Sequence, residues 1–515
     1  MMNKLKKYIL LVFVGLVFSS CQQDILDTTS FNNPNPELAF TSPELVQLAV
    51  NGVYNAAQIG YYSSTPLSNS ARGYVFGAAY FQQNEVRGED VVNTQAFYQL
   101  TYESNYDPTT ANNAYYWSDA YRLINRANLV NEGINRAVNN KVISEDQGKI
   151  YKGEVLFFRA LAHLELLKHF SRPYHLDNGS SMGVPYRTIG VDTEATIEQA
   201  MQVGRGTVAE GYEKLFEDLN FAENGLPGNA QRQGINKIGK ITKGAAIAIK
   251  IRAYLNMRNW SKVIEEYNKL TSMYTLESNP LTVFNNNLTN TESIFSIINT
   301  ANNNPGVNGA LASQFSGRSL IAISPILWNN PLWLKDDKRR SVTDVVSGSR
   351  FTRKYKDITT FSDASPIVRF SEMKLAAAEA HARLNNMTSA LLLLNEVRNR
   401  ALETPNTEAY TSSSFSNKEG MIKAILLERR IELSCEGVRW ADIHRLINDD
   451  IAPTYGIPAK VPNGFPSASS YTIGIPYTGN LTNSIPYTDK RFLWPIPLMT
   501  TSVNPLLAGQ QNPEW

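Results

Sequence analysis

Two irregular stretches of the chain, 60–113 and 324–334, combine aromatic side chains with amide and charged side chains. Aromatic rings stack on the apolar C–H face of a sugar, while Asn, Asp, Gln and Arg side chains exchange hydrogen bonds with its hydroxyl groups. The candidate ligand contacts are Tyr74, Tyr80, Asn84, Arg87, Asp90, Tyr98, Trp328 and Trp333. In a chain of this size most loop aromatics pack beneath the loops, so a core position is the alternative for each ring. We expect the ligand face to be built from these two stretches.

Motifs for covalent or metal chemistry are sparse. The five histidines include no pair at the i, i+4 spacing of a helix-borne zinc site. Ser371 and Lys374 match the SxxK spacing of serine acyl-enzymes, but no SDN or KTG motif accompanies them. A pair of carboxylates that cleaves a glycosidic bond stays open as an alternative, because the sequence alone does not exclude one. We therefore predict a binding protein with no catalytic residue, no cofactor and no metal ligand.

The composition of the 515 residues restricts the class of protein further. Hydrophobic residues make up 43%, which is ample for a large core and excludes a disordered or fibrous chain. Lys and Arg number 49 against 47 Asp and Glu, so the net charge is +2. The sequence contains no basic or acidic run of five or more residues. A nucleic-acid-binding protein would concentrate basic residues on one face. We predict no nucleic-acid partner, and the abundance of Tyr, at 25 residues, suits a neutral polar ligand.

The N-terminus has the pattern of a secretory signal peptide over residues 1–20. Lys4, Lys6 and Lys7 precede an apolar run over 8–18, which is too short to span a bilayer. Ser19, Ser20 and Cys21 follow, and this order resembles the lipoprotein box in which the cysteine is diacylated. An ordinary secreted protein with an early cysteine is the alternative. We expect lipidation at Cys21 and a polar tether over residues 21–40.

Helical periodicity dominates the chain from residue 115 onward. The segments 243–272 and 370–402 share one design, in which a helix ends in Leu-Asn and a polar turn leads to a second helix. The second helix carries a small or branched residue followed by apolar residues at +4 and +7, a pattern typical of tetratricopeptide-type hairpins. The stretches 275–370 and 448–515 are rich in Asn, Pro and Gly, and long loops of this kind usually carry function. The predicted fold is mainly α, with helical hairpins and large irregular loops.

The segment ILLERRIELSCEGVRWADIHRL, residues 425–446, packs many charges into one or two helical turns. Such a density of Glu and Arg requires mutual pairing where the helix is partly buried. We therefore interpret it as scaffold and not as a ligand site. Cys435 lies within this apolar helical context, and we expect a buried, inert thiol.

Three segments together resemble the SusD/RagB family. KGEVLFFRALAHLELLKHFSRPY (152–174) is similar to a family helix, and residues 425–446 are similar to its most specific helix. WPIPLMTTSVNPLLAGQQNPEW (494–515) resembles the C-terminal segment of the family, with Glu514-Trp515 in place of Gly-Tyr. With the lipoprotein start, the resemblance extends over essentially the whole chain. It implies an N-terminal SusD-like region over 41–235 and a C-terminal RagB/SusD region over 236–515, integrated in one SusD-like architecture.

The resemblance also implies a location and partners. Members of this family are outer-membrane lipoproteins of Bacteroidetes that face the cell exterior. They cap a SusC-like TonB-dependent transporter and pass it glycans, or peptides in the RagB branch. The ligand-contacting residues of the family vary in type, so only the lipidated Cys21 carries over by motif. The resemblance therefore favours a glycan-binding lipoprotein; a peptide-binding lipoprotein and a surface glycoside hydrolase are the alternatives.

Overall fold

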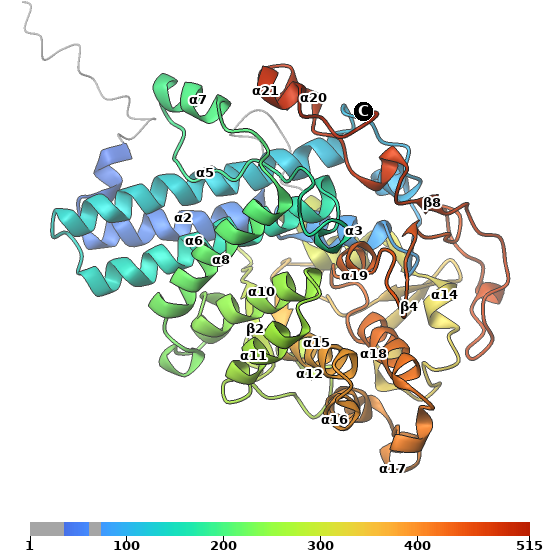
Figure 1. Ribbon diagram of the computed structural model, residues 1–515. Helices are drawn as coiled ribbons and strands as arrows, with labels where there is room; N and C mark the ends of the chain where they lie inside the picture. The colour runs from blue at the N-terminus through green and yellow to red at the C-terminus, as the bar shows by residue number, and fades with distance from the viewer. Residues whose placement is uncertain (1–35, 61–73) are drawn as a thin grey trace, which may run out of the picture.

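The computed structural model describes residues 36–60 and 74–515, and helices dominate them (Figure 1). The helices of seven or more residues are α2 (Pro43–Ile59), α3 (Ala78–Val86), α5 (Ala111–Asn139), α6 (Glu145–Phe170), α7 (Glu194–Met201), α8 (Val208–Gly225), α10 (Lys243–Asn256), α11 (Trp260–Leu270), α15 (Phe370–Arg383), α16 (Met387–Arg398), α18 (Lys418–Glu432) and α19 (Arg439–Arg445). The single-turn helices are α4 (Gln99–Tyr102), α9 (Asn236–Gly239), α12 (Thr282–Asn285), α13 (Gly306–Gly309), α14 (Pro325–Trp328), α17 (Pro405–Glu408), α20 (Leu498–Thr501) and α21 (Pro505–Ala508). The mainly α prediction is confirmed.

Short strands pair two by two between the helices. They are β1 (Val91–Asn93), β2 (Ser293–Ile297), β3 (Ile321–Ile323), β4 (Thr343–Val346), β5 (Ser349–Thr352), β6 (Ser365–Arg369), β7 (Gly456–Ile457) and β8 (Ile485–Pro486). The antiparallel pairs are β1–β3, β2–β6, β4–β5 and β7–β8. The pairs β1–β3, β2–β6 and β7–β8 join segments far apart in the sequence, whereas β4 and β5 form a local hairpin. The β7–β8 pair, for example, closes a long loop in the C-terminal region.

The two predicted helical hairpins are present as α10–α11 and α15–α16, and α11 also packs against α15. The small or branched residues expected at the helix crossings, Val263 and Ala390, are fully buried. Asn259 and Asn386 cap the second helices by accepting a backbone N–H through the side chain. The polar turns predicted from the sequence therefore start each second helix, and the apolar positions bring the paired helices together.

The N-terminal half packs long helices in pairs, α5 against α6 and α6 against α8. Ser144 accepts a hydrogen bond from the Gln147 N–H and starts α6, which ends shortly before Pro173. Within this half, residues 36–40 form a 3₁₀ turn whose Phe40 ring lies against Gly133 of α5. A Cβ at position 133 would overlap that ring. Residues 36–40, which were expected in the tether, therefore belong to the packed fold. Cys21 and the predicted signal peptide lie outside the described residues.

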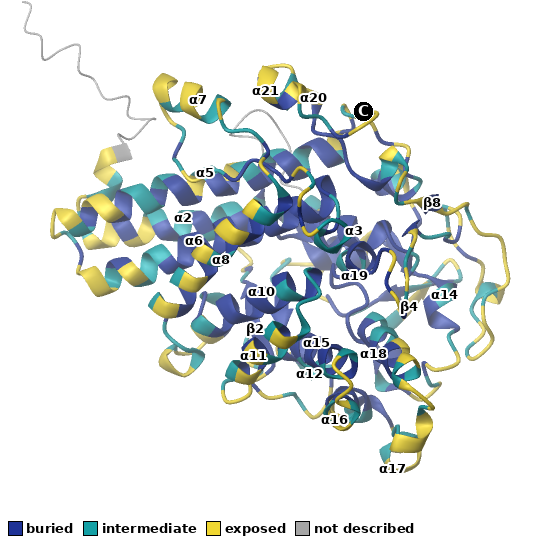
Figure 2. Cartoon of the chain, in the orientation of Figure 1, coloured by how far each residue is buried: buried dark blue, intermediate teal, exposed yellow. Residues whose placement is uncertain are grey.

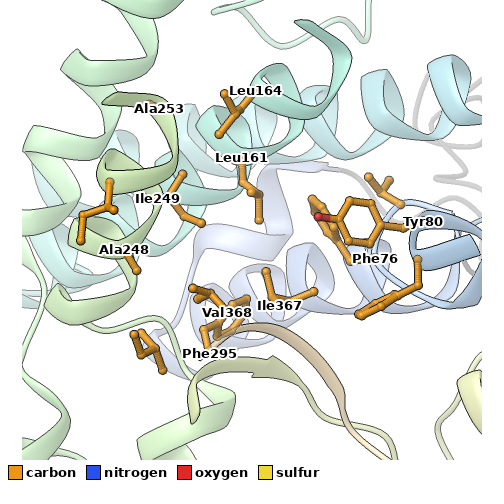
Figure 3. Packing of buried hydrophobic residues seen from close by; sticks show 14 of the residues in the cluster. Phe76, Tyr80, Leu161, Leu164, Ala248, Ile249, Ala253, Phe295, Ile367 and Val368 are labelled. Atoms are coloured by element: carbon orange, nitrogen blue, oxygen red, sulfur yellow. The ribbon is translucent and has the colours of Figure 1, made fainter. Parts of the chain in front are cut away.

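The main core lies where the two halves meet. Figure 3 shows Leu161 of α6, Ile249 of α10, Phe295 of β2 and Val368 of β6, which belong to the same buried cluster as Tyr80. The C-terminal segment returns across the molecule: the backbone N–H of Trp494 donates to the His169 carbonyl, and Arg205 donates to the Asn512 side chain at 2.8 Å. Within residues 36–60 and 74–515, no helix combines the length and apolar character needed to cross a bilayer.

Candidate ligand-binding site

The eight side chains predicted to contact a ligand lie in the interior of the protein. Each is exposed by 3% or less: Tyr74, Tyr80, Asn84, Arg87, Asp90, Tyr98, Trp328 and Trp333. A ring at this depth presents no face to a sugar, so the structure corrects the prediction that these residues form the ligand face. The physical reason is that burial of a large aromatic side chain is strongly favourable, and Gly- and Asn-punctuated segments bend easily enough to turn such side chains inward.

The two tryptophans of the 324–334 stretch pack on each other and are covered by a cation. Trp328 and Trp333 meet edge to face with ring centres 5.4 Å apart. The Arg340 guanidinium lies 4.7 Å and 4.2 Å from these two centres and donates a hydrogen bond to the Trp328 carbonyl at 3.0 Å. Stacking with Arg340 thus takes the place of the predicted stacking on a sugar.

Helix α3 holds two of the predicted contacts, Tyr80 and Asn84, with Arg87 as its C-cap, and all of the helix residues are buried. The Tyr80 hydroxyl donates to Glu165, and the Asn84 amide donates to the Tyr80 carbonyl at 3.0 Å. Arg87, at the end of the helix, donates to the Phe492 carbonyl at 2.6 Å. The polar side chains between the aromatics therefore satisfy internal groups, and the same is true of Tyr74, whose hydroxyl donates to Asn112 at 2.9 Å.

Asp90 belongs to an ion cluster that we name the Glu89 cluster: Glu89, Asp90, Arg430 and Arg439. Arg430 Nε lies 3.0 Å from both carboxylate oxygens of Asp90, and its Nη2 lies 3.1 Å from Glu89 Oε1. Arg439 Nη2 lies 2.5 Å from the same Glu89 oxygen. The cluster joins the segment after α3 to α18 and α19.

The other charges of 425–446 pair in the interior, as predicted, but several of their partners lie outside the segment, whereas mutual pairing was expected. Arg339 Nη1 lies 2.5 Å from Glu428 Oε1, and Arg445 Nη2 lies 2.7 Å from Glu379 Oε2. Cys435 is a buried free thiol, and burial raises its pKa to about 12. The segment is scaffold, but it also lines a cavity through Leu426, Leu427, Arg430, Arg439, Ile443 and Leu446.

That cavity, which we name the main cavity, has a volume of about 900 Å³. Its walls are α18, α19, the β7–β8 pair and residues 330 and 332, and the Glu89 cluster contributes Glu89, Arg430 and Arg439. Figure 1 shows α19 between α18 and β8. Helix α14, which belongs to the 324–334 stretch, lies to the right of α18 and α19 in this view. The predicted stretches therefore do reach a cavity, but through Glu89, Asn330 and Leu332, which are neighbours of the predicted residues.

The lining of the main cavity suits a sugar. Tyr455 lines it while 67% exposed, which leaves its ring available for stacking. Asn330, Lys423 and Ser484 contribute amide, ammonium and hydroxyl groups. An exposed ring beside such groups is the combination that recognises the apolar and the hydroxyl-bearing faces of a saccharide.

Glu89 is held in its ionised form at the cavity wall. Burial opposes the charged carboxylate, but the positive charges of Arg439 and Arg430 outweigh burial and lower the pKa of Glu89 to about 2. A group with this pKa does not donate a proton near neutral pH. Among the described residues, no group of three or more His, Cys, Asp or Glu side chains is arranged to hold a metal ion.

The residue that the sequence reasoning missed is Tyr455. It lies between Pro453 and Gly456 in the stretch 448–515, which was predicted to carry function as a long irregular loop. Loops lie at the surface more often than the elements they connect, and the turn-forming Pro453 and Gly456 place Tyr455 in such a loop. Aromatic residues are denser in 60–113, and the ligand face was therefore predicted there and in 324–334.

Comparisons with known proteins agree with this architecture. Two family models match: that of the SusD family over residues 341–515, and that described as "Starch-binding associating with outer membrane" over residues 27–255. The chain belongs to the SusD/RagB family. A SusD superfamily protein from Bacteroides fragilis superimposes with a TM-score of 0.76 and 25% identity, over 90% of this chain and 99% of that one.

Two other relatives extend the comparison. SusD-like protein P2 of Formosa agariphila is 23% identical over 72% of this chain and 78% of its own. The structure of a SusD-like carbohydrate-binding protein from Bacteroides vulgatus superimposes with a TM-score of 0.69 at 21% identity, over 90% of this chain and 97% of that one. These likenesses show the same fold across the family, and the family's association with the outer membrane applies to this member.

Proposed function

We propose that this SusD/RagB protein is a cell-surface lipoprotein that binds an oligosaccharide or polysaccharide and passes it to a SusC-like TonB-dependent transporter. It is anchored through Cys21 and faces the cell exterior. The main cavity is the glycan site. The observation that carries the proposal is the exposed ring of Tyr455 in a cavity of about 900 Å³ that also offers amide, ammonium and hydroxyl groups.

The charges of the main cavity favour binding over hydrolysis. Glycosidases use two carboxyl groups, one of them protonated at the pH of reaction. The described lining of this cavity supplies one carboxylate, Glu89, which its arginine partners hold ionised. Its arginines are in turn balanced by Glu89 and Asp90. A neutral glycan fits a site whose fixed charges are mostly compensated.

The test is a binding titration with Tyr455→Ala against a panel of soluble polysaccharides, followed by calorimetry on those that bind. Loss of one stacking ring removes about 1–3 kcal/mol of buried apolar contact, so affinity should fall roughly tenfold to a hundredfold. The matched control is Phe465→Ala, which removes another exposed ring of the 448–515 stretch outside the cavity lining. Its affinity should equal that of the wild type.

Other outcomes would contradict the proposal. Unchanged affinity in Tyr455→Ala would place the glycan site elsewhere. Binding of peptides but of no glycan would favour the peptide-binding alternative. Release of reducing ends that stops in Glu89→Gln would make the protein a hydrolase.

A further inference from the structure

A second hollow, which we name the α5 groove, lies between α5, α7 and the C-terminal helices α20 and α21. Its volume is about 440 Å³. Trp117 and Tyr121 of α5 form one wall, and Ile197 of α7 together with Met499 and Val503 forms the others. This lining is predominantly apolar, and it shares no residue with the main cavity.

Apolar side chains surround the α5 groove as well as lining it. Figure 2 shows exposed residues on α7, α20 and α21. The large hydrophobic side chains exposed there are Ile197, Leu498, Met499, Val503 and Leu506. A contiguous exposed patch of this kind marks an interaction surface, and methionines suit it because their flexible side chains adapt to a partner.

One cation at the α5 groove lacks an acidic partner among the residues that the structure describes. Arg187 lines the groove and donates to the Ala200 carbonyl, but no carboxylate lies within ion-pair distance. Burial lowers the pKa of Arg187, and only Tyr121 opposes the shift. In contrast, the buried Arg159 pairs with Asp218 at 2.5 Å. The groove thus presents a positive charge in apolar surroundings, which favours a partner that brings a carboxylate.

The groove lies on the same helix as the point where the tether joins the fold. Phe40 packs on Gly133 of α5, about 24 Å along the helix axis from Trp117 at 1.5 Å per residue. The chain from Cys21 to Pro36 extends at most about 50 Å. A lipid at Cys21 would therefore keep the Gly133 end of α5 within roughly 50 Å of the membrane surface, and the groove, about 24 Å farther along the helix, within reach of an outer-membrane partner.

We propose that the α5 groove is the docking site for the transporter: it receives an apolar peptide segment of that protein whose carboxylate pairs with Arg187. This inference rests on the proposed function, because it assumes a lipid-anchored protein that works with a transporter. A protein segment fits better than a small amphiphile, because a ligand enclosed in the groove would leave Leu498 and Leu506 exposed beyond it.

The first test uses the full-length lipoprotein in its native outer membrane, with a photo-crosslinking benzophenone amino acid at Val503. The matched control is the same amino acid at Val345, another exposed valine, which lies on β4 outside the groove; the two side chains are 68% and 50% exposed. We expect the adduct of the transporter, identified by mass spectrometry, to be at least tenfold more abundant at 503 than at 345. Equal adducts at both positions, or adducts at 345 alone, would overturn the proposal.

The second test measures the transporter that co-purifies with the protein after mild solubilisation. Val503→Asp and Arg187→Glu should each lower its amount at least tenfold, whereas Val345→Asp should not. All three variants should bind glycan as the wild type does, which shows that they are folded. Unchanged co-purification in both groove variants would overturn the docking site and leave the proposed function intact.

Two further outcomes distinguish the docking proposal from the proposed function and from a small-molecule site. If the wild type itself retains no transporter, the partnering in the proposed function and the docking site both fail. If the purified protein binds decanoate, a simple apolar carboxylate, and Val503→Asp abolishes that binding without affecting the transporter, the groove is a small-molecule site and the docking proposal is wrong.

Discussion

The Arg87 guanidinium lies over the Trp440 ring, 3.4 Å from its centre, with the centre of Trp494 5.2 Å away. It also contacts His169 Nδ1 at 3.1 Å and donates to the Phe492 carbonyl. One side chain thus links the end of α3 to α19 and the C-terminal segment. At the scale of single residues, a charge predicted to meet a ligand instead holds three segments together.

We expect Arg87→Met to lower the free energy of unfolding by about 1–3 kcal/mol, because it leaves a buried carbonyl without its donor. Chemical denaturation followed by tryptophan fluorescence would measure the change. The control is Arg126→Met, which changes an exposed side chain of α5 and should shift stability by less than about 0.5 kcal/mol. Equal stability of Arg87→Met and the wild type would contradict the role assigned to Arg87.

Lys460 is a second buried cation at the same place. Its ammonium donates to the Val86 carbonyl at 2.7 Å and lies 4.5 Å from the centre of the Tyr102 ring. Burial, helped by the charge of Arg87, lowers the pKa of Lys460 to about 7. Between pH 7 and 10 the unfolded chain therefore binds more protons at this residue than the folded chain does, so its contribution to stability rises with pH.

The prediction is that the wild type gains stability relative to Lys460→Met between pH 7 and pH 10. The limiting slope is about 1.4 kcal/mol per pH unit, since that is the free energy of one pKa unit. Denaturation midpoints of both proteins at pH 6, 8 and 10 would show it. A difference between them that stays constant with pH would mean that Lys460 keeps its ordinary pKa in the folded protein.

At the scale of elements, α18 is fixed to the strands and loops around it by buried charges. Glu432 Oε1 lies 2.5 Å from Arg369 Nη1 of β6 and 2.6 Å from Arg400 Nη2, and its Oε2 lies 2.8 Å from Arg339 Nη1. Burial opposes the charge of Glu432, but these three arginines hold its pKa well below the ordinary value near 4.5. Its stabilising effect is therefore present above pH 4.5 and is lost as the pH falls below it.

Glu432→Gln should destabilise the protein at pH 7 by about 3–5 kcal/mol, because it leaves buried guanidinium groups without their shared anion. The difference from the wild type should shrink as the pH falls below 4. Thermal unfolding across this range is the measurement. Glu265→Gln removes a carboxylate from an exposed pair with Lys262 and should leave the melting temperature unchanged at every pH. A larger effect in Glu265→Gln than in Glu432→Gln would contradict this account.

At the scale of the whole molecule, the two halves of the described chain share one core. Arg205 in the N-terminal half donates to the Gln510 carbonyl at 2.8 Å, so the last residues of the chain close against the first helices. The main cavity and the α5 groove occupy different parts of this body. A lipoprotein that holds a ligand in one and a partner in the other would keep both engaged at once.

Attachment to the membrane is predicted to depend on Cys21. Radiolabelled palmitate should label the wild type and not Cys21→Ala, because the thiol is the acceptor of the lipid. Cys435→Ala is the control, since this thiol is buried and should not be acylated. Equal labelling of the wild type and Cys21→Ala would exclude the lipid anchor.

The sequence determined the helical hairpins, because their apolar spacing and polar turns act within a few residues of each other. The pairing of the charges in 425–446 was also predictable, since buried charges require partners whatever the fold. Burial of the aromatic residues in 74–113 and 324–334 was decided by tertiary structure. A ring such as Trp328 contacts either solvent or Arg340, and only the approach of distant segments selects between them. Tertiary structure also decides the position of Tyr455 in the main cavity, because α18 and Leu332, which line that cavity with it, come together only when the chain folds.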